Sequence, residues 1–199
     1  MKTVFLFNVV CAMLGLAFTA HAVGNVAAGK VKAAQCIACH GIDGNSEMPQ
    51  YPKLAGQHEY YLVQSMKAYI AEKRHDPIMS PMAKELKEAD NDINDLAAYF
   101  ASQPANTCTN KPITVTNKTS KAKICFECHK ADGNSEKPFF PKIAGQHEAY
   151  LIKSMKAYKE GTRLDKQMSQ IALLFEDEND IVDLATYFSS QKSDTCKEK

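Results

Sequence analysis

The sequence predicts an all-α protein built from two tandem domains that are related by internal duplication. Residues 36–79 align on residues 125–168 without a gap, and about 26 of the 44 aligned positions are identical. Apolar residues recur at helical spacing in both copies, whereas no stretch alternates with the period of two that marks a β-strand. A chain of 199 residues is long enough for two small domains.

Three helices are expected in each copy. They are a short apolar helix at 25–38 and 120–127, a second helix at 58–73 and 147–160, and a last helix at 91–102 and 179–190. Asp90 and Asn179 are the expected N-caps of the last helices. Gly, Pro, Asp and Asn fill the segments between the first two helices, which are therefore expected to be loops.

Domain boundaries follow from the repeat. We expect a signal peptide at 1–22, a first domain at 23–104, a linker at 105–119 and a second domain at 120–199. The linker is rich in Thr, Asn, Lys and Pro and has little preference for helix or strand. Because domains of roughly 80 residues are only marginally stable on a hydrophobic core alone, each copy is expected to be stabilised by a covalent cross-link or a bound cofactor.

The first residues are typical of an export signal. Lys2 supplies a positive charge, residues 4–20 are mostly apolar, and Ala20-His21-Ala22 is the small-x-small pattern that signal peptidase cleaves. We therefore expect cleavage after Ala22 and a mature chain in the periplasm. The alternative is an uncleaved membrane anchor, for which the apolar run is short.

Overall composition excludes several classes of protein. Hydrophobic residues make up 45% and charged residues 24%, the balance of a soluble globular protein. The formal net charge is +1, from 24 Lys and Arg against 23 Asp and Glu. Such a balanced charge does not indicate a nucleic-acid partner or a polybasic membrane-binding protein. Peripheral association with a membrane stays open.

Each copy contains a Cys-x-x-Cys-His motif, at residues 36–40 and 125–129. Two thiols one helical turn apart can each add to one vinyl group of a porphyrin, and the imidazole of the next residue then reaches the iron from the same side. The motifs predict two covalently bound haem c groups, attached through four cysteines and ligated by two histidines: Cys36, Cys39, Cys125, Cys128, His40 and His129. A thioredoxin-like site would need a βαβ setting, and a zinc site would need a fourth ligand.

The second axial ligand of each iron can be screened by the repeat. Three pairs of candidate side chains occur at matching positions: Met66 with Met155, Met79 with Met168, and His58 with His147. The first pair lies on the apolar stripe of a helix, where Met is usually a core residue. The histidines lie at a helix start, where a histidine can instead cap the helix or face the solvent. Met79 and Met168 are expected on a loop, each 39 positions beyond its haem histidine, and we favour them.

The motifs together resemble the dihaem cytochrome c4 family over about residues 25–192. Both copies contain Cys-x-x-Cys-His, Asp-Gly-Asn-Ser, a Pro-Lys-Leu/Ile-Ala-Gly-Gln-His box, a loop Met and a last helix with Tyr-Phe. The resemblance implies two class I cytochrome c domains that face each other across a pseudo-two-fold axis, with His/Met ligation. It also implies that the carbonyl groups of Pro52 and Pro141 accept a hydrogen bond from the haem histidines.

An electron carrier, rather than an enzyme, is expected from iron with both axial positions filled by protein. The first hypothesis is a shuttle of single electrons between a quinol-oxidising complex and a terminal oxidase, such as a cytochrome oxidase, or a reductase. The alternative is the dihaem electron-accepting subunit of a sulfur-oxidising enzyme that acts on thiosulfate or sulfide. A dihaem peroxidase would need one open iron and usually a longer chain, so no catalytic residue is assigned.

Two further pairs recur in the repeat. Cys108 and Cys196 follow the last helices and lack a following histidine, and in an exported protein we expect a disulfide between them. Bonds to a partner protein or to another copy are the alternatives. Arg74 and Arg163 are expected either at haem propionates or at helix ends.

Overall fold

The computed structural model describes residues 24–86, 91–108 and 120–197, together with the single positions 112, 114 and 116. The expected signal peptide, its cleavage site, Asp90 and part of the expected linker lie outside the described residues. Among the described helices, none combines the length and the apolar composition that a membrane span requires.

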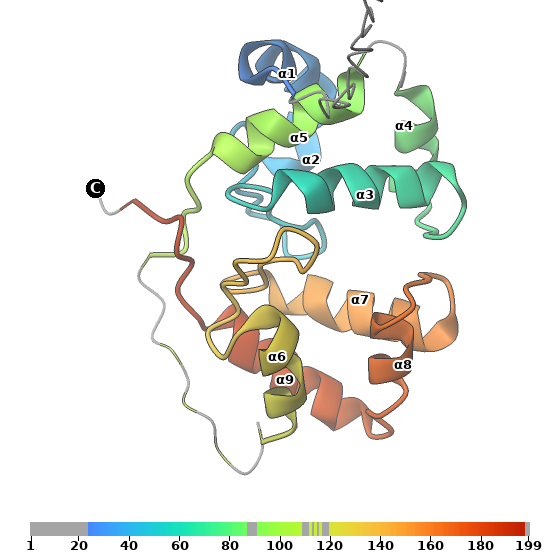
Figure 1. Ribbon diagram of the computed structural model, residues 1–199, viewed down its shortest axis with the longest axis vertical. Coiled ribbons are helices and arrows are strands. Elements are labelled where there is room, and N and C mark those ends of the chain that lie inside the picture. Colours follow the sequence, from blue (N-terminus) through green and yellow to red (C-terminus); the bar gives the residue numbers. More distant parts are fainter. Residues whose placement is uncertain are drawn as a thin grey trace, which may run out of the picture.

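The described secondary structure is helical in both halves of the chain. The first half contains α1 (Val26–Lys32), the 3-10 helix η1 (Ala33–Gln35), α2 (Ile37–His40), α3 (Glu59–Ile70), α4 (Met79–Glu85) and α5 (Asp92–Ser102). The second half contains the 3-10 helix η3 (Ser120–Cys125), α6 (Phe126–His129), α7 (Glu148–Glu160), α8 (Met168–Ala172) and α9 (Glu178–Ser189). Figure 1 shows two stacked domains, with α3 and α7 facing each other across the boundary. The predicted all-α fold of two duplicated domains is confirmed.

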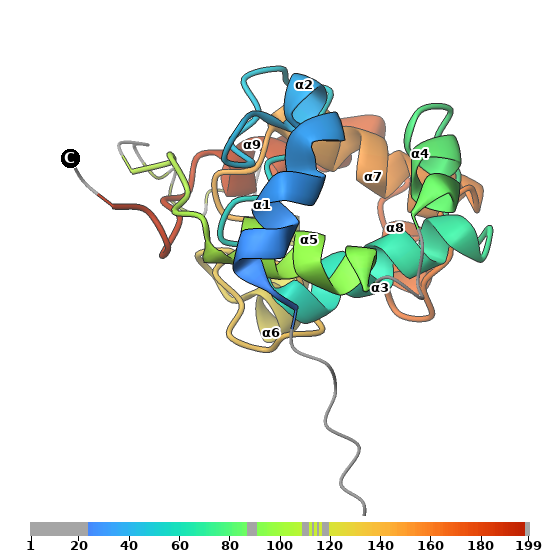
Figure 2. The same cartoon turned by 90° about the horizontal axis from the view of Figure 1, so that it is seen from above.

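In the first domain α1 crosses α5 at close range (Figure 2). Gly29 makes this approach possible, because a Cβ atom at that position would lie 1.9 Å from the carbonyl oxygen of Asp95. Leu62 of α3 packs against Leu96 and Phe100 of α5 in the core of the domain. The repeated Tyr-Phe pair thus places Phe in the core, while the Tyr99 hydroxyl donates to the carbonyl oxygen of Ile42 at 2.7 Å.

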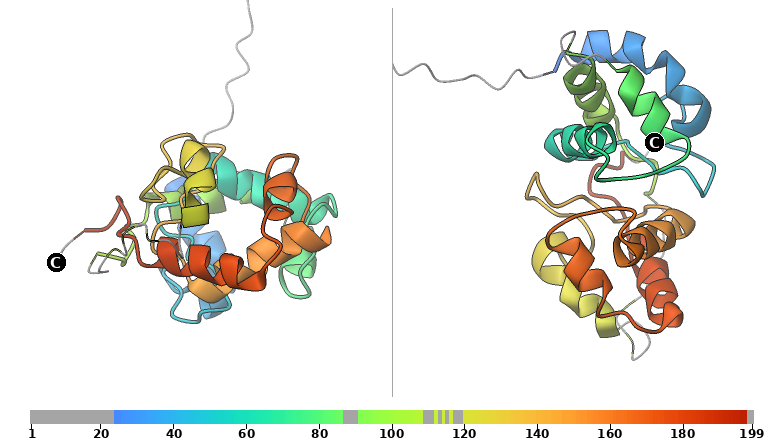
Figure 3. Two further views of the ribbon diagram at one scale, coloured as in Figure 1. Left: turned by 90° about the horizontal axis from the view of Figure 1, so that it is seen from below. Right: turned by 90° about the vertical axis from the view of Figure 1, so that its right-hand side faces the viewer.

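The second domain has an equivalent core, but its first helical segment differs from that of the first domain. Leu151 and Met155 of α7 pack with Ile181 and Phe188 of α9, and Figure 3 shows the domain from below and from the side. The expected apolar helix at 120–127 is replaced by η3, which is followed directly by α6. In the first domain the expected helix at 25–38 is likewise divided into α1, η1 and α2.

Two sequence expectations about helix starts are wrong. Met79 and Met168 do not lie on loops: each is the first residue of a short helix, α4 or α8. The N-cap of α9 is Asp177 instead of Asn179, because the Asp177 carboxylate accepts the backbone N–H of Asn179 at 2.9 Å. A carboxylate that accepts free N–H groups is enough to start a short helix, and the periodicity of apolar residues does not reveal it.

The domains meet through contacts that occur twice, once in each direction. Backbone hydrogen bonds join His75 N–H to Thr162 O at 2.8 Å and Leu164 N–H to Lys73 O at 2.7 Å. These bonds flank an isolated antiparallel bridge between Arg74 and Arg163. Because each segment contacts its own counterpart, the interface has the self-complementary character of a two-fold axis.

The segments that follow α5 and α9 cross to the opposite domain. Thr107 lies over Gly145 of the second domain, and Thr195 lies over Gly56 of the first. A Cβ atom at either glycine would lie within 2.4 Å of an atom of the threonine above it. The backbone N–H of Ser193 donates to the carbonyl oxygen of Thr107 at 3.1 Å, so the two crossing segments also contact each other.

Candidate functional site

Each Cys-x-x-Cys-His motif is held on a single helical turn. In the first domain the backbone N–H of His40 donates to the carbonyl oxygen of Cys36 at 3.0 Å, so that α2 brings both cysteines and the histidine to one end of the domain. In the second domain Cys125 is the N-cap of α6 and His129 is its last residue. All four motif cysteines are free thiols in the structure. The local helix therefore provides the spacing that two thioether bonds to one porphyrin require.

The motif histidines are buried and oriented by proline carbonyl groups. His40 Nδ1 lies 2.9 Å from Pro52 O, and His129 Nδ1 lies 2.8 Å from Pro141 O. A carbonyl oxygen can only accept, so Nδ1 carries the proton and Nε2 bears the lone pair. Burial lowers the pKa of both imidazoles, and the hydrogen bonds to proline oppose this only in part. Both rings are thus neutral at pH 7, the form that ligates a metal.

The motif thiols do not resemble those of a redox-active dithiol. Burial raises the pKa of Cys36 to about 11 and that of Cys125 to about 12, with a smaller contribution from the neighbouring cysteine. Catalytic Cys-x-x-Cys sites have a lowered thiol pKa instead. In the described residues, no three His, Cys, Asp or Glu side chains are grouped so that they could hold a metal ion. Neither the thioredoxin-like nor the zinc alternative therefore finds support in the geometry.

Met79 and Met168 start α4 and α8 in equivalent positions. Both side chains are half-buried, and the backbone N–H of each donates to an aspartate three residues earlier, Asp76 or Asp165, at 2.9 and 2.8 Å. The helix α4 packs on α3, as α8 packs on α7. Met168 also packs against the hydrophobic core of the second domain.

The other two candidate pairs lie on α3 and α7 and at the N-caps of these helices. Met155 is a buried member of the second hydrophobic core, and Met66 is half-buried at the equivalent position of α3. The imidazole Nε2 of His58 lies 2.8 Å from Ser135 O, and that of His147 lies 2.8 Å from Ser46 O. These histidines join the two domains through their Nε2 atoms.

The arginine pair lies in the domain interface, just beyond the C-terminal ends of α3 and α7. The backbone N–H of Arg74 donates to Ala68 O at 3.1 Å, and that of Arg163 donates to Ala157 O at 3.0 Å. Arg74 donates to the Tyr150 hydroxyl at 2.8 Å, and Arg163 donates to the Tyr61 hydroxyl at 2.7 Å. Each guanidinium also stacks on a tyrosine of its own domain, with its carbon 4.4 to 4.5 Å from the ring centre. These crossed contacts are not predicted from the sequence, although both the arginines and their tyrosine partners occupy matching positions in the two copies.

Cys108 and Cys196 are joined by a disulfide in the structure. Their Cα atoms are 5.3 Å apart, and the bond closes a sequence separation of 88 residues. It links the two segments that cross between the domains.

The residues at each motif fit a covalently attached haem. Two unpaired thiols lie one turn apart, a neutral imidazole bears its lone pair on Nε2, and each domain also has a methionine at the start of a short helix. Nitrogen and sulfur donors of this kind are typical axial ligands of haem iron. The same donor set is present in both domains, so the chain has two equivalent sites.

Comparison with known proteins identifies the family of this chain. A family model described as cytochrome c matches residues 26–104 and 117–192, once in each half of the chain. Cytochrome c4 of Pseudomonas aeruginosa is 38% identical over 188 residues, which are 87% of this chain and 92% of the relative. This chain belongs to the cytochrome c4 family.

Two further similarities extend this assignment. The crystal structure of reduced recombinant cytochrome c4 from Pseudomonas stutzeri has a TM-score of 0.72 and 31% sequence identity, covering 84% of this chain and 99% of that chain. A protein named thiosulfate dehydrogenase electron acceptor, from Thiomonas intermedia, is 32% identical over 169 residues, 76% of this chain and 75% of the relative. As a cytochrome c4 with two Cys-x-x-Cys-His motifs, the chain carries two covalent haem c groups and is a dihaem c-type electron-transfer protein with redox protein partners.

Proposed function

We propose that this cytochrome c4 carries single electrons with two His/Met-ligated haems, His40 and Met79 in the first domain and His129 and Met168 in the second. Cys36, Cys39, Cys125 and Cys128 form the thioether bonds. The proposal rests above all on the buried, neutral histidines, whose Nε2 lone pairs remain for a metal because Nδ1 donates to a proline. The occurrence of the same arrangement in both domains supports two equivalent sites.

The residues around each site suit repeated electron exchange. When bound, the haem supplies a one-electron Fe(III)/Fe(II) couple. The thioether ligand favours the reduced iron, whereas the hydrogen bond from Nδ1 to the proline carbonyl strengthens the imidazole as a donor and favours the oxidised iron. Aromatic side chains such as Phe100 and Phe188 exclude water from the core. With both axial positions occupied by protein, we propose no catalytic residue.

We propose that the mature protein works in the periplasm, in a first domain at 23–104 and a second at 120–199 connected by a linker at 105–119. The export signal at 1–22 supports this location. The donor would be a quinol-oxidising complex and the acceptor a terminal oxidase or reductase, reached by diffusion or from the membrane surface.

A second candidate function is electron acceptance from a thiosulfate- or sulfide-oxidising enzyme. The similarity to the Thiomonas intermedia protein favours this candidate. Co-purification from the source cells separates the two: recovery with a sulfur-compound dehydrogenase supports the second function, and recovery with a quinol-oxidising complex supports the first.

The ligand assignment is tested by an anaerobic redox titration with optical and magnetic circular dichroism detection. Wild-type protein, Met79→Ala and Met168→Ala are compared. We expect each substitution to abolish the sulfur–iron charge-transfer signal of one haem and to leave the other. If the signal persists in full, Met66 or Met155 is the ligand instead, and if wild-type protein has no such signal a histidine is the ligand; either result makes the proposal wrong.

A further inference from the structure

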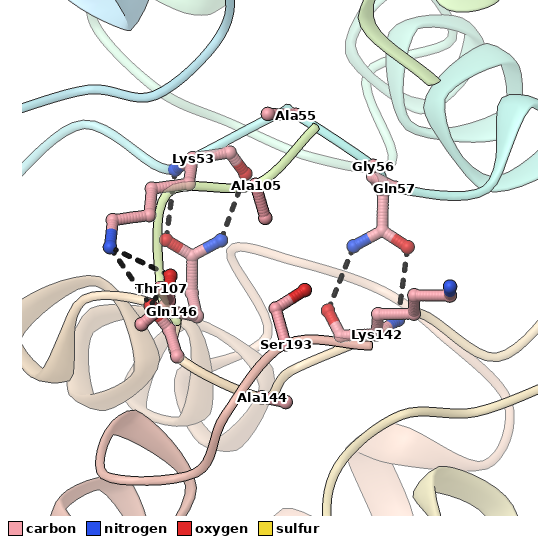
Figure 4. A pocket seen from close by; sticks show the side chains of 11 residues that line it. Lys53, Ala55, Gly56, Gln57, Ala105, Thr107, Lys142, Ala144, Gln146 and Ser193 are labelled. Atoms are coloured by element: carbon pink, nitrogen blue, oxygen red, sulfur yellow. Dashed lines mark hydrogen bonds between the residues drawn. The ribbon is translucent and has the colours of Figure 1, made fainter. Parts of the chain in front are cut away.

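Two glutamines form matching hydrogen-bond clamps across the domain interface. Gln57 Nε2 donates to Lys142 O at 2.8 Å, and its Oε1 accepts from Lys142 N–H at 2.9 Å. In the opposite direction, Gln146 Nε2 donates to Lys53 O and Oε1 accepts from Lys53 N–H, both at 2.9 Å. Figure 4 shows the two side chains side by side, each reaching into a loop of the other domain. Each amide therefore binds both backbone groups of one residue, as a neighbouring strand would.

Each glutamine is also fixed to its own domain. Gln57 Oε1 accepts a second hydrogen bond from the backbone N–H of His58, the N-cap residue of α3, at 3.0 Å. Gln146 does the same with His147, the N-cap residue of α7, at 3.0 Å. Both glutamines are only 8% exposed. A buried amide with three hydrogen bonds has one available orientation, so the start of one helix is connected rigidly to a loop of the other domain.

The clamped residues are next to the prolines that orient the haem histidines. Lys142 follows Pro141, whose carbonyl oxygen lies 2.8 Å from His129 Nδ1. Lys53 follows Pro52, whose carbonyl oxygen lies 2.9 Å from His40 Nδ1. The peptide plane between proline and lysine contains both the proline carbonyl and the lysine N–H, so a glutamine that holds the N–H also fixes the direction of the carbonyl.

We propose that Gln57 and Gln146 are crossed positioning residues, each of which sets the axial histidine of the haem in the opposite domain. Gln57 acts on His129 through Lys142 and Pro141, and Gln146 acts on His40 through Lys53 and Pro52. The inference rests on the proposed axial ligands. If the inference holds, the midpoint potential of each haem depends on a residue of the opposite domain. Two independent cytochrome domains would not show this dependence.

The direction of the effect follows from the histidine hydrogen bond. A carbonyl that accepts from Nδ1–H makes the imidazole a stronger donor and favours the oxidised iron. Loss of the clamp lets the proline carbonyl turn away and weakens that bond. We therefore expect a higher midpoint potential for the haem of the opposite domain.

The test compares Gln57→Leu and Gln146→Leu in the full-length holoprotein, because leucine is similar in size and removes all the amide hydrogen bonds. Gln57→Leu should raise the potential of the second-domain haem alone, and Gln146→Leu that of the first-domain haem alone. To assign the two potentials to the two haems, each substitution is also made in the Met79→Ala protein, where the midpoint potential of the first-domain haem is displaced. The Nδ1 proton resonance of the affected histidine in the reduced protein should shift in the same variant.

Two controls keep the outcome decisive. Gln64→Leu changes an exposed glutamine on α3 and should leave both potentials unchanged. Gln57→Asn keeps an amide that is too short to bind both groups of Lys142, and it should give the same crossed shift if the leucine variant does not fold. A shift of the haem in the same domain, an equal shift of both haems, or no shift would overturn the inference. If these variants keep two haems and both charge-transfer signals, the proposed axial ligands are intact. A missing crossed shift then contradicts the positioning role of the glutamines and not the ligand assignment.

Discussion

Individual histidines in this protein divide into two kinds by the nitrogen they use. His40 and His129 bond a proline carbonyl through Nδ1 and keep Nε2 for a metal, whereas His58 and His147 use Nε2 to bond a serine carbonyl of the opposite domain. All four occur in repeated motifs, but only His40 and His129 follow a Cys-x-x-Cys pair. The structure adds which ring nitrogen of each histidine is used for a hydrogen bond within the protein.

The pKa of His147 gives a prediction about acid stability. Burial lowers this pKa, and the charge of Lys53 acts in the same direction, while the hydrogen bond to Ser46 opposes both. The unfolded chain takes up a proton at about pH 6.5, but the folded protein does so only at a lower pH. The free energy of unfolding therefore falls as the pH drops through about 6.5, until the folded pKa is reached.

We expect this loss to be smaller in His147→Gln, whose amide can still donate to Ser46 O but does not titrate. Thermal unfolding midpoints of both proteins between pH 7.5 and about pH 5 measure the difference. The exposed His75 provides the matched control, because His75→Gln leaves the interface intact. Parallel curves for wild type and His147→Gln would show that His147 does not contribute.

At the scale of elements, two very short helices determine where the methionines lie. The helix α8 has only five residues, and its start depends on Asp165, whose carboxylate accepts the N–H groups of Gln167 and Met168 at 2.9 and 2.8 Å. Asp76 accepts those of Ile78 and Met79 at 2.9 Å in the same way. Helices of this length are not stable by themselves, so the cap and the packing against α7 or α3 hold them in place.

Removal of the cap should loosen the second-domain methionine. Asp165 precedes the N-cap residue Gln167, and its carboxylate accepts two backbone N–H groups at the helix start, so we expect Asp165→Ala to cost about 1 kcal/mol of stability, as the loss of an N-cap side chain does. The sulfur–iron charge-transfer signal of one haem should then disappear at a lower temperature than in wild type. Asp165→Asn retains a side-chain oxygen that accepts both N–H groups and should behave like wild type. Equal melting of both signals in Asp165→Ala would contradict a local role for this cap.

At the scale of the whole molecule, the domains are held by crossed contacts and by one covalent bond. The segments after α5 and α9 each cover a glycine of the other domain, and the disulfide between Cys108 and Cys196 joins them. Gly56 and Gly145 have positive φ angles of 69° and 64°, so both conformation and space favour glycine there. The bond closes 88 residues, a long loop in the unfolded chain.

Loss of this disulfide should destabilise the protein mainly through the unfolded state. For a closed loop of this length the chain-entropy relation gives an effect of about 4–5 kcal/mol on the free energy of unfolding. The double variant Cys108→Ser, Cys196→Ser avoids a single unpaired thiol and should unfold at a lower denaturant concentration without loss of haem. Non-reducing mass spectrometry of tryptic peptides should find the two cysteines in one linked species in wild type. Two alkylatable thiols in wild type would rule out the bond.

Particular residues show which features of the structure can be predicted from the sequence. The haem motifs, the duplication and the two longest helices of each domain follow from spacing and periodicity, because those signals are local in the chain. The starts of α4, α8 and α9 do not, since they depend on single aspartate side chains. The identity of Gln57 and Gln146 in both copies indicated importance but not a partner.

The sequence by itself thus determined that the chain has two equivalent haem domains, because covalent attachment requires a fixed order of residues within one helical turn. Only the tertiary structure decided how the domains act on each other. Gln57 and Lys142 are 85 positions apart, and Arg74 and Tyr150 are 76 apart. Contacts over such separations depend on the docking of complete surfaces, and no local pattern of residues encodes which surface faces which.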